Sequence, residues 1–191
     1  MTDATLARAA PQSGSASVKV WDPFVRIFHW SLVSLFIAAF VTADHFETLH
    51  MAAGYALAGL VAARIVWGFI GPPHARFRSF MFAPGTILTF LRDTMRLRAP
   101  RHLGHNPAGG LMVLALIAMM LVIAATGHLQ TLDAFAEAEW IEDLHEGAVF
   151  ATLGLIALHL VGVFVASVEH RENLVAAMFT GRKRPLSPTE G

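Results

Sequence analysis

The sequence contains no cysteine, and this absence excludes a whole group of redox sites. Disulfides, iron–sulfur clusters held by cysteine and haem attached through thioether bonds all need that residue. Charged residues are also scarce, at 15% of 191 residues, whereas 55% are hydrophobic and the mean hydropathy is +0.55. This is more apolar surface than a soluble domain of this length buries in its core, so the composition favours a membrane protein. Histidine, with ten residues, is the abundant metal ligand that remains.

Four apolar segments approach the roughly 20 residues that a spanning helix needs. They cover about residues 24–43, 49–70, 108–127 and 147–168. We therefore expect an all-α membrane protein, built as a four-transmembrane-helix bundle. A flexible N-terminal tail (1–17), which lacks the apolar core of a cleaved signal, and a C-terminal tail (186–191) flank it.

The distribution of charge predicts the orientation of this bundle. All 14 Lys and Arg residues fall on one side: before or near the start of the first segment, near the end of the second or between it and the third, or after the fourth. Six of the 14 acidic residues share that side and eight lie on the other, so a net charge of zero conceals +8 on one side and −8 on the other. The positive-inside rule then predicts that both termini are cytoplasmic.

The long middle loop carries one more helical pattern, at residues 84–98. Its apolar residues recur at helical spacing and its arginines are displaced from them, which predicts an interfacial helix lying on the membrane. We assign no chemistry to it.

Two histidines of the fourth segment, His145 and His159, lie 14 residues apart. On a helix this spacing leaves about −40° of net rotation and a separation of ~21 Å along the axis, so both imidazoles share one face. With the orientation above, His145 and His50 lie at the outer end. His29, roughly 8 Å deep, and His159, roughly 15 Å from the inner end, form a second pair.

A single imidazole in a membrane helix could simply hydrogen-bond a neighbouring helix, but four at two matched levels favour iron ligation. Glycines at 54, 147, 154 and 162 would let a flat porphyrin approach the helix backbones. They would serve close helix packing equally well.

The other histidines are taken as interfacial, although His45 could compete with His50 and His105 could contact a proton path or a quinone headgroup. These six are His45, His74, His102, His105, His128 and His170.

Several motifs, in order, resemble the bacterial cytochrome b561 family, and most closely its branch with the cytochrome b subunits of nickel–iron hydrogenases. They are VWDPFVRIFHW (20–30), LHMAAGYALAGLVAARIVWGFIGPPHARF (49–77), LGHNPAGG (103–110), LHEG (144–147) and ALHLVGV with HRENLVAAMFTGRKR (157–184). The resemblance covers about residues 18–185.

The resemblance implies a four-helix domain in the bacterial inner (plasma) membrane with two non-covalent b haems. Its ligand positions fall on the four histidines chosen above: His29 and His159 for the inner haem iron, His50 and His145 for the outer haem iron. Gly54 would line the cofactor site. Arg26 and Arg64 occupy positions of basic residues near the inner haem; they either pair with its propionates or are ordinary interface arginines.

Two axial imidazoles leave iron no open position, so such centres carry electrons singly. We expect an electron-transfer subunit rather than a stand-alone oxidoreductase. It would link the membrane quinone pool with a periplasmic c-type cytochrome, dehydrogenase or hydrogenase. The alternatives are a superoxide oxidase coupled to quinone reduction, and a transporter whose histidines relay protons. The lipid bilayer is an expected partner and nucleic acid is not; homo-oligomerisation stays open.

Overall fold

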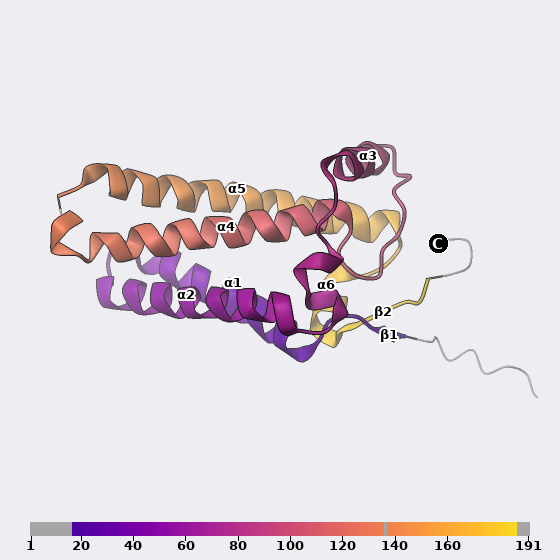
Figure 1. The fold of residues 1–191 in the computed structure, drawn as a ribbon, viewed down its shortest axis with the longest axis horizontal. Helices are drawn as coiled ribbons and strands as arrows, with labels where there is room; N and C mark the ends of the chain where they lie inside the picture. Colours follow the sequence, from indigo (N-terminus) through magenta and orange to yellow (C-terminus); the bar gives the residue numbers. More distant parts are fainter. Residues whose placement is uncertain (1–16, 136, 187–191) are drawn as a thin grey trace, which may run out of the picture.

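The computed structural model describes residues 17–135 and 137–186 (Figure 1). The two predicted tails lie outside these ranges, apart from Ser17 and Leu186. The regular elements, in chain order, are β1 (Val18–Lys19), α1 (Pro23–Thr42), α2 (Glu47–Ile70), η1 (Pro73–Ala75), η2 (Phe77–Ser79), α3 (Pro84–Met95), α4 (Pro107–Gln130), η3 (Asp133–Phe135), α5 (Glu139–Glu169), α6 (Leu174–Thr180) and β2 (Arg182–Lys183).

Four of these helices, α1, α2, α4 and α5, are long and apolar enough to cross a membrane. They match the four predicted spans, so the prediction of an all-α, four-span protein is confirmed. The start of α4 follows the sequence: the Asn106 side chain accepts a hydrogen bond from the Gly109 N–H, and Pro107 occupies the first turn. Asp22 caps α1 in the same way: its side chain accepts a hydrogen bond from the Val25 N–H, and Pro23 is the first residue of the helix.

The four long helices form one bundle in which α1 packs on α2, α2 on α4 and α4 on α5. Both ends of the described chain lie at the same end of this bundle, which we call the terminal end (Figure 1). The α1–α2 and α4–α5 connections lie at the opposite end, which we call the loop end. Every Lys and Arg among residues 17–135 and 137–186 belongs to segments at the terminal end, and the eight acidic residues described above belong to the loop end.

An apolar layer crosses the middle of the bundle. Phe36 of α1, Leu57 and Val61 of α2 and Met120 of α4 are buried there, and aliphatic side chains of α5 complete the layer. The buried hydroxyl of Thr152, between these α5 side chains, donates to the Ala148 carbonyl of its own helix and so leaves the layer apolar. The layer keeps the two ends of the bundle apart as separate environments.

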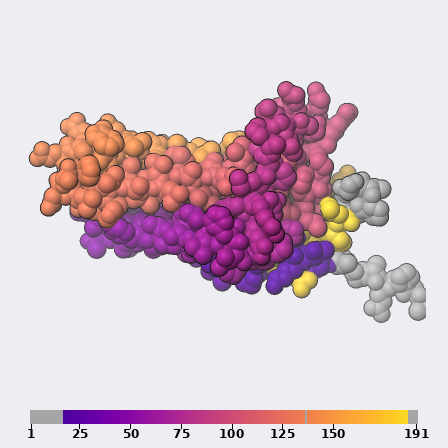
Figure 2. Space-filling view, viewed as in Figure 1, coloured from indigo at the N-terminus to yellow at the C-terminus, as the bar shows by residue number. Residues whose placement is uncertain are grey.

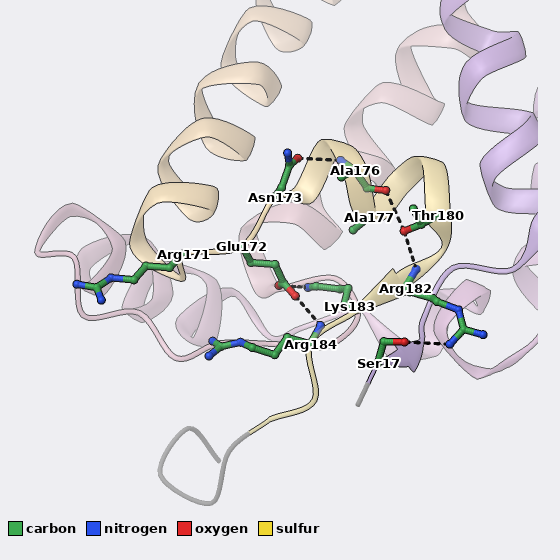
Figure 3. Close-up of a pocket in the computed structure, with 10 residues that line it drawn as sticks. All are labelled: Ser17, Arg171, Glu172, Asn173, Ala176, Ala177, Thr180, Arg182, Lys183 and Arg184. Carbon is green, nitrogen blue, oxygen red and sulfur yellow. Dashed lines mark hydrogen bonds and ion pairs between the residues drawn. The ribbon is translucent and has the colours of Figure 1, made fainter. Parts of the chain in front are cut away.

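Short elements close the terminal end. Strands β1 and β2 pair antiparallel, with Val18 opposite Lys183, and so join the two ends of the described chain. The Glu172 carboxylate accepts a hydrogen bond from Arg101 at 2.8 Å. It also accepts one from the Arg184 backbone N–H at 2.9 Å and lies 3.4 Å from the Lys183 ammonium (Figure 3). This carboxylate therefore ties the middle loop and the C-terminal segment to the end of α5.

The predicted interfacial segment folds as α3, which ends at Met95. Figure 1 shows α3 nearly end-on, so its axis runs across the bundle, and Figure 2 shows this region projecting from the side of the terminal end. Leu88, Leu91 and Met95 are exposed on it. Its direction and exposed apolar side chains are those of a helix lying in a membrane interface.

Helix α5 begins at Glu139, eight residues before the predicted span. Hydropathy marks only the apolar part of a helix, whereas acidic residues are favourable in a first turn, where they face the positive end of the helix dipole. Glu139 and Glu142 occupy that turn. As a consequence, His145 lies about two turns inside a helix rather than at its first residue.

Candidate haem-binding site

The structure brings His50 of α2 and His145 of α5 together at the loop end, with one ring edge-on to the other. Their ring centroids lie 6.2 Å apart and the ring planes meet at 70°. Two imidazole–metal bonds of about 2 Å each, with about 1 Å from each nitrogen to its ring centre, place two axial imidazoles about 6 Å apart. The observed spacing therefore fits one iron between the two rings.

Hydrogen bonds determine which ring nitrogens of this pair are available. The Nδ1 atom of His50 lies 2.8 Å from the carbonyl oxygen of Ala39, and a carbonyl can only accept, so this nitrogen carries the proton. The Nδ1 atom of His145 lies 3.0 Å from Oγ1 of Thr126, whose own hydroxyl hydrogen points to the Val122 carbonyl. Nδ1 therefore donates in both residues, which leaves Nε2 of each free to bind a metal.

His29 of α1 and His159 of α5 form the second pair, on the terminal side of the apolar layer. The two rings lie close enough to interact electrostatically. Within the described chain, the buried Nδ1 atom of His29 has no hydrogen-bond partner. Helix α5 thus contributes one histidine to each pair, as its 14-residue spacing predicted.

Several buried polar atoms near this second pair also lack partners within residues 17–135 and 137–186. They are Arg26 Nε, His29 Nδ1, Trp30 Nε1, Arg64 Nη1, Trp67 Nε1 and His105 Nδ1. Buried polar groups in proteins are nearly always hydrogen-bonded, so such a concentration indicates a polar group that completes the site. These atoms are mostly donors, and two belong to guanidinium groups, those of Arg26 and Arg64, which favours an anionic group.

Arg64 is buried with only 2% of its surface exposed, so it is not an ordinary interface arginine. Its Nη2 donates to the Ala75 carbonyl at 3.0 Å and its guanidinium lies 5.3 Å from the centre of the Phe77 ring. Within the described chain no carboxylate lies at ion-pair distance from it, and the nearest acidic influence is that of Asp22 at longer range. A buried cation in that position needs an anion.

Arg26 has a different role. Its Nη2 donates to the carbonyl of Phe179, close to the end of α6, while its Nε stays without a partner among the described residues. Gly181 follows with φ of 77°, a left-handed conformation that suits glycine, and a Cβ there would lie 2.7 Å from the Trp21 carbonyl oxygen. Arg26 therefore holds α6 against α1, with one nitrogen left for a further group.

Gly54, Gly147, Gly154 and Gly162 border open space, because a Cβ built on any of them meets nothing within 4 Å. Close helix packing would bring a neighbouring backbone into that space, so the packing alternative does not describe them. Gly127 differs: a Cβ there would lie 3.1 Å from Cε1 of His145. This residue lets α4 pass directly beside the His145 ring.

The remaining histidines lie apart from the two pairs, with one exception. His45 is exposed in the α1–α2 turn, so the structure places His50 rather than His45 opposite His145. His128 hydrogen-bonds the Tyr55 hydroxyl at 3.0 Å, and His102 hydrogen-bonds the Pro100 carbonyl at 2.9 Å. The exception is His105, whose buried ring lies between those of Trp21 and Phe80.

Sequence reasoning missed the residues that orient the loop-end histidines. Thr126 lies in an apolar span and looks like an ordinary membrane threonine; its position one residue before a glycine was the only available signal. The Ala39 carbonyl that orients His50 carries no signal at all, because any residue supplies one. Trp67, three residues after Arg64 on α2, could have been found by helical spacing.

One surface cavity, of about 390 Å³, lies away from the histidines, at the junction of α5, α6 and β2 (Figure 3). Its basic side chains do not converge: Arg171 and Arg182 point away from each other, and Lys183 faces Glu172. Its polar atoms bond one another, as in the contact of Thr180 with the Ala176 carbonyl. The cavity is part of the junction that closes the terminal end.

Comparison with known proteins agrees with this geometry. The family profile described as prokaryotic cytochrome b561 matches residues 20–181. A probable Ni/Fe-hydrogenase B-type cytochrome subunit of Rhizobium leguminosarum bv. viciae is 21% identical over 214 residues, covering 87% of this chain and 89% of the relative. A protein with the same description from Bradyrhizobium diazoefficiens is 22% identical over 218 residues, covering 90% and 87%. No solved structure matches the chain significantly.

The fold, the histidines and these matches define the class: the protein is a multi-pass membrane cytochrome of the b type, which binds haem b and takes part in electron transport. It belongs to the prokaryotic cytochrome b561 family.

Proposed function

We propose that this cytochrome binds two b haems and conducts electrons across the bacterial inner membrane. His50 and His145 would hold one haem at the loop end, and His29 and His159 a second at the terminal end. The observation that carries the proposal is the placement of the His50 and His145 rings 6.2 Å apart, with Nδ1 of each in a hydrogen bond and Nε2 of each available. The second pair, on the other side of the apolar layer, supports a second site.

When bound, each haem supplies reversible one-electron chemistry at its iron. His50 with His145 and His29 with His159 would each supply two imidazole ligands to a haem iron, which would leave no position for oxygen or an organic substrate at the metal. The Ala39 carbonyl and the Thr126 hydroxyl hold the loop-end imidazoles in one tautomer and orientation. The apolar layer of Phe36, Leu57 and Met120 excludes water between the sites.

The two sites lie one behind the other along the bundle. His145 and His159 are about 21 Å apart along α5 at the ordinary helical rise. Since the bundle axis follows the membrane normal in a four-span protein, the sites lie near opposite faces of the bilayer. Electrons that pass between them cross most of the apolar core.

The charge distribution supports the orientation and the partners. All Lys and Arg residues of the described chain lie at the terminal end, which favours a cytoplasmic location of both termini. The loop end then faces the periplasm, where a c-type cytochrome, a dehydrogenase or a hydrogenase would exchange electrons with the His50–His145 site. The two relatives are described as hydrogenase cytochrome subunits, which supports a hydrogenase as one such partner. A quinone in the membrane would be the other electron carrier.

Haem stoichiometry tests this proposal. Purified protein should contain two haems per chain that acidified organic solvent extracts, with a low-spin reduced spectrum that carbon monoxide does not change. One haem per chain, or a high-spin signal, would mean that a ligand pair is wrong. A protein without a visible spectrum would contradict the proposal entirely.

Ligand variants separate the two sites. His50→Ala and His145→Ala should each remove the same haem, and His29→Ala and His159→Ala should each remove the other. His45→Ala is the matched control, since His45 is exposed in the adjacent turn and should leave both haems in place. Loss of a haem in that control would refute the assignment of the loop-end pair.

A further inference from the structure

The loop between α3 and α4 inserts one histidine into the core of the terminal end. The His105 ring lies between Trp21, at a centroid distance of 4.7 Å, and Phe80, at 4.6 Å. Its Nδ1 atom is buried and has no hydrogen-bond partner in the described part of the chain. The histidine is the residue just before the Asn106 cap, so its backbone is held at the start of α4.

His105 is neutral at physiological pH. Burial, and to a smaller extent the positive charges of Arg64 and Lys183 together with His74 and His159, lower its pKa to about 3. A neutral imidazole has one N–H donor, and a carboxylate can use it without a second positive charge being buried. The ring is therefore suited to donate a hydrogen bond and not to form an ion pair.

The surroundings of His105 connect it to the buried Arg64. The Arg64 guanidinium faces Phe77 at 5.3 Å, Phe77 contacts Phe80 at a centroid distance of 5.8 Å, and Phe80 contacts His105. Trp67, one turn after Arg64 on α2, packs against the same apolar cluster as Trp21. Arg64 Nη1, Trp67 Nε1 and His105 Nδ1 are all buried without partners among the described residues. These three nitrogen atoms at the terminal end can all donate hydrogen bonds, so an acidic acceptor would satisfy them.

We propose that His105 donates a hydrogen bond from Nδ1 to a propionate of the haem held by His29 and His159, beside a propionate contact of Arg64. This inference rests on the proposed function, since it needs a haem at the terminal end. It gives the loop between α3 and α4 a role in setting the reduction potential of one haem. A donor to the propionate offsets its negative charge, which favours the reduced iron.

The test compares His105→Phe, His105→Asn and the control His102→Phe in the full-length, haem-loaded protein. Phenylalanine keeps the ring between Trp21 and Phe80 but removes the donor, whereas asparagine retains a donor. His102 lies in the same loop and uses its Nδ1 on the Pro100 carbonyl. Both haem potentials are measured by titration, and redox-difference infrared spectra are recorded with haem labelled with ¹³C in its propionate carboxyls.

In His105→Phe, the reduction equilibrium constant of the terminal-end haem should fall about tenfold, which is 59 mV for a one-electron couple. The loop-end haem should keep its potential, and the labelled carboxylate bands should shift. His105→Asn should recover part of the change, and His102→Phe should match the wild type. Retention of the haem in His105→Asn but not in His105→Phe would also support the contact.

Unchanged carboxylate bands in His105→Phe would overturn the inference, because Nδ1 would then bond something other than a propionate. Equal shifts of both haems, or loss of the terminal-end haem in both variants, would overturn it too, since these indicate a general effect on the fold. Failure of the proposed function is distinguishable, because it shows in the wild-type protein as fewer than two haems.

Discussion

The Nδ1 atom of His145 lies 3.0 Å from Oγ1 of Thr126, on the neighbouring helix α4. The threonine hydroxyl already donates to the Val122 carbonyl, at 2.8 Å, so its lone pair accepts from the imidazole. Thr126 is buried, with 5% of its surface exposed. One hydroxyl therefore sets the tautomer of a histidine on another helix.

Replacing this hydroxyl should change one haem only. In Thr126→Val the His145 imidazole loses its acceptor, becomes a weaker base and stabilises oxidised iron less well. We expect a rise in the potential of the loop-end haem and a loss of roughly 10-fold or more in its affinity. Potentiometric titration and haem content after washing measure both effects. Thr152→Val is the matched control, because Thr152 is also buried but bonds only the Ala148 carbonyl of its own helix. Equal effects of the two variants would contradict the assigned role.

The open space at Gly54 offers a second test. A side chain there meets nothing within 4 Å in the protein, so Gly54→Leu should be tolerated by the fold. If a haem fills that space, about one turn from His50, leucine should reduce haem content from two per chain towards one. Gly59→Leu is the control, since Gly59 also borders open space but is exposed on α2. Pyridine haemochrome analysis gives the count, and two haems in Gly54→Leu would place Gly54 outside the cofactor site.

The bundle and the histidine levels followed from the sequence because they depend on periodic or one-dimensional properties. Apolar length marks the spans, and a 14-residue interval fixes the relative faces of His145 and His159. The full start of α5 at Glu139 could not be found by hydropathy, since its first two turns are acidic. The Thr126 contact and the buried corner around His105 depend on which helices are neighbours, and the order of packing is not contained in any local pattern.

The Glu172 carboxylate should make stability depend on pH. Burial on its own raises the pKa of this group, but the hydrogen bonds from Arg101 and the Arg184 N–H and the charge of Lys183 outweigh burial, so the pKa is lowered. A carboxylate with a lowered pKa stabilises the fold above its unfolded pKa, and this contribution is lost as the pH falls through the folded pKa. Glu172→Gln should therefore destabilise the protein at pH 7 by about 1–3 kcal/mol.

Thermal unfolding in detergent at pH 7 and at successively lower pH measures this effect. The difference between Glu172→Gln and the wild type should shrink as the wild-type carboxylate becomes protonated. The control is Glu137→Gln. Glu137 is exposed at the loop end, so this change should leave stability unchanged at every pH. A difference that stays constant down to acid pH would show that the ion pairs do not contribute.

The loop end should attract a cationic partner. Its eight acidic residues are exposed, and no Lys or Arg occurs between Arg26 and Arg64 or between Arg101 and Arg171. Part of this pattern follows from membrane orientation alone, because the positive-inside rule excludes basic residues from that side. A surface of net charge −8 beside the His50–His145 site nevertheless raises the encounter rate with a basic protein and lowers it for an anion, by ~10-fold or more at low salt.

Stopped-flow electron exchange with a basic soluble c-type cytochrome, at salt concentrations of roughly 10 to 300 mM, tests this attraction, since the Debye length falls over that range. The rate should fall steeply with salt, and less steeply when Glu139, Glu142 and Asp143 are replaced by their amides. These three lie on the first two turns of α5, ahead of His145, whereas the same change at Asp44 alone should have a smaller effect. Superoxide is an anion and should react slowly at this surface. A flat salt profile together with fast haem reduction by superoxide would favour the superoxide oxidase over the electron conduit.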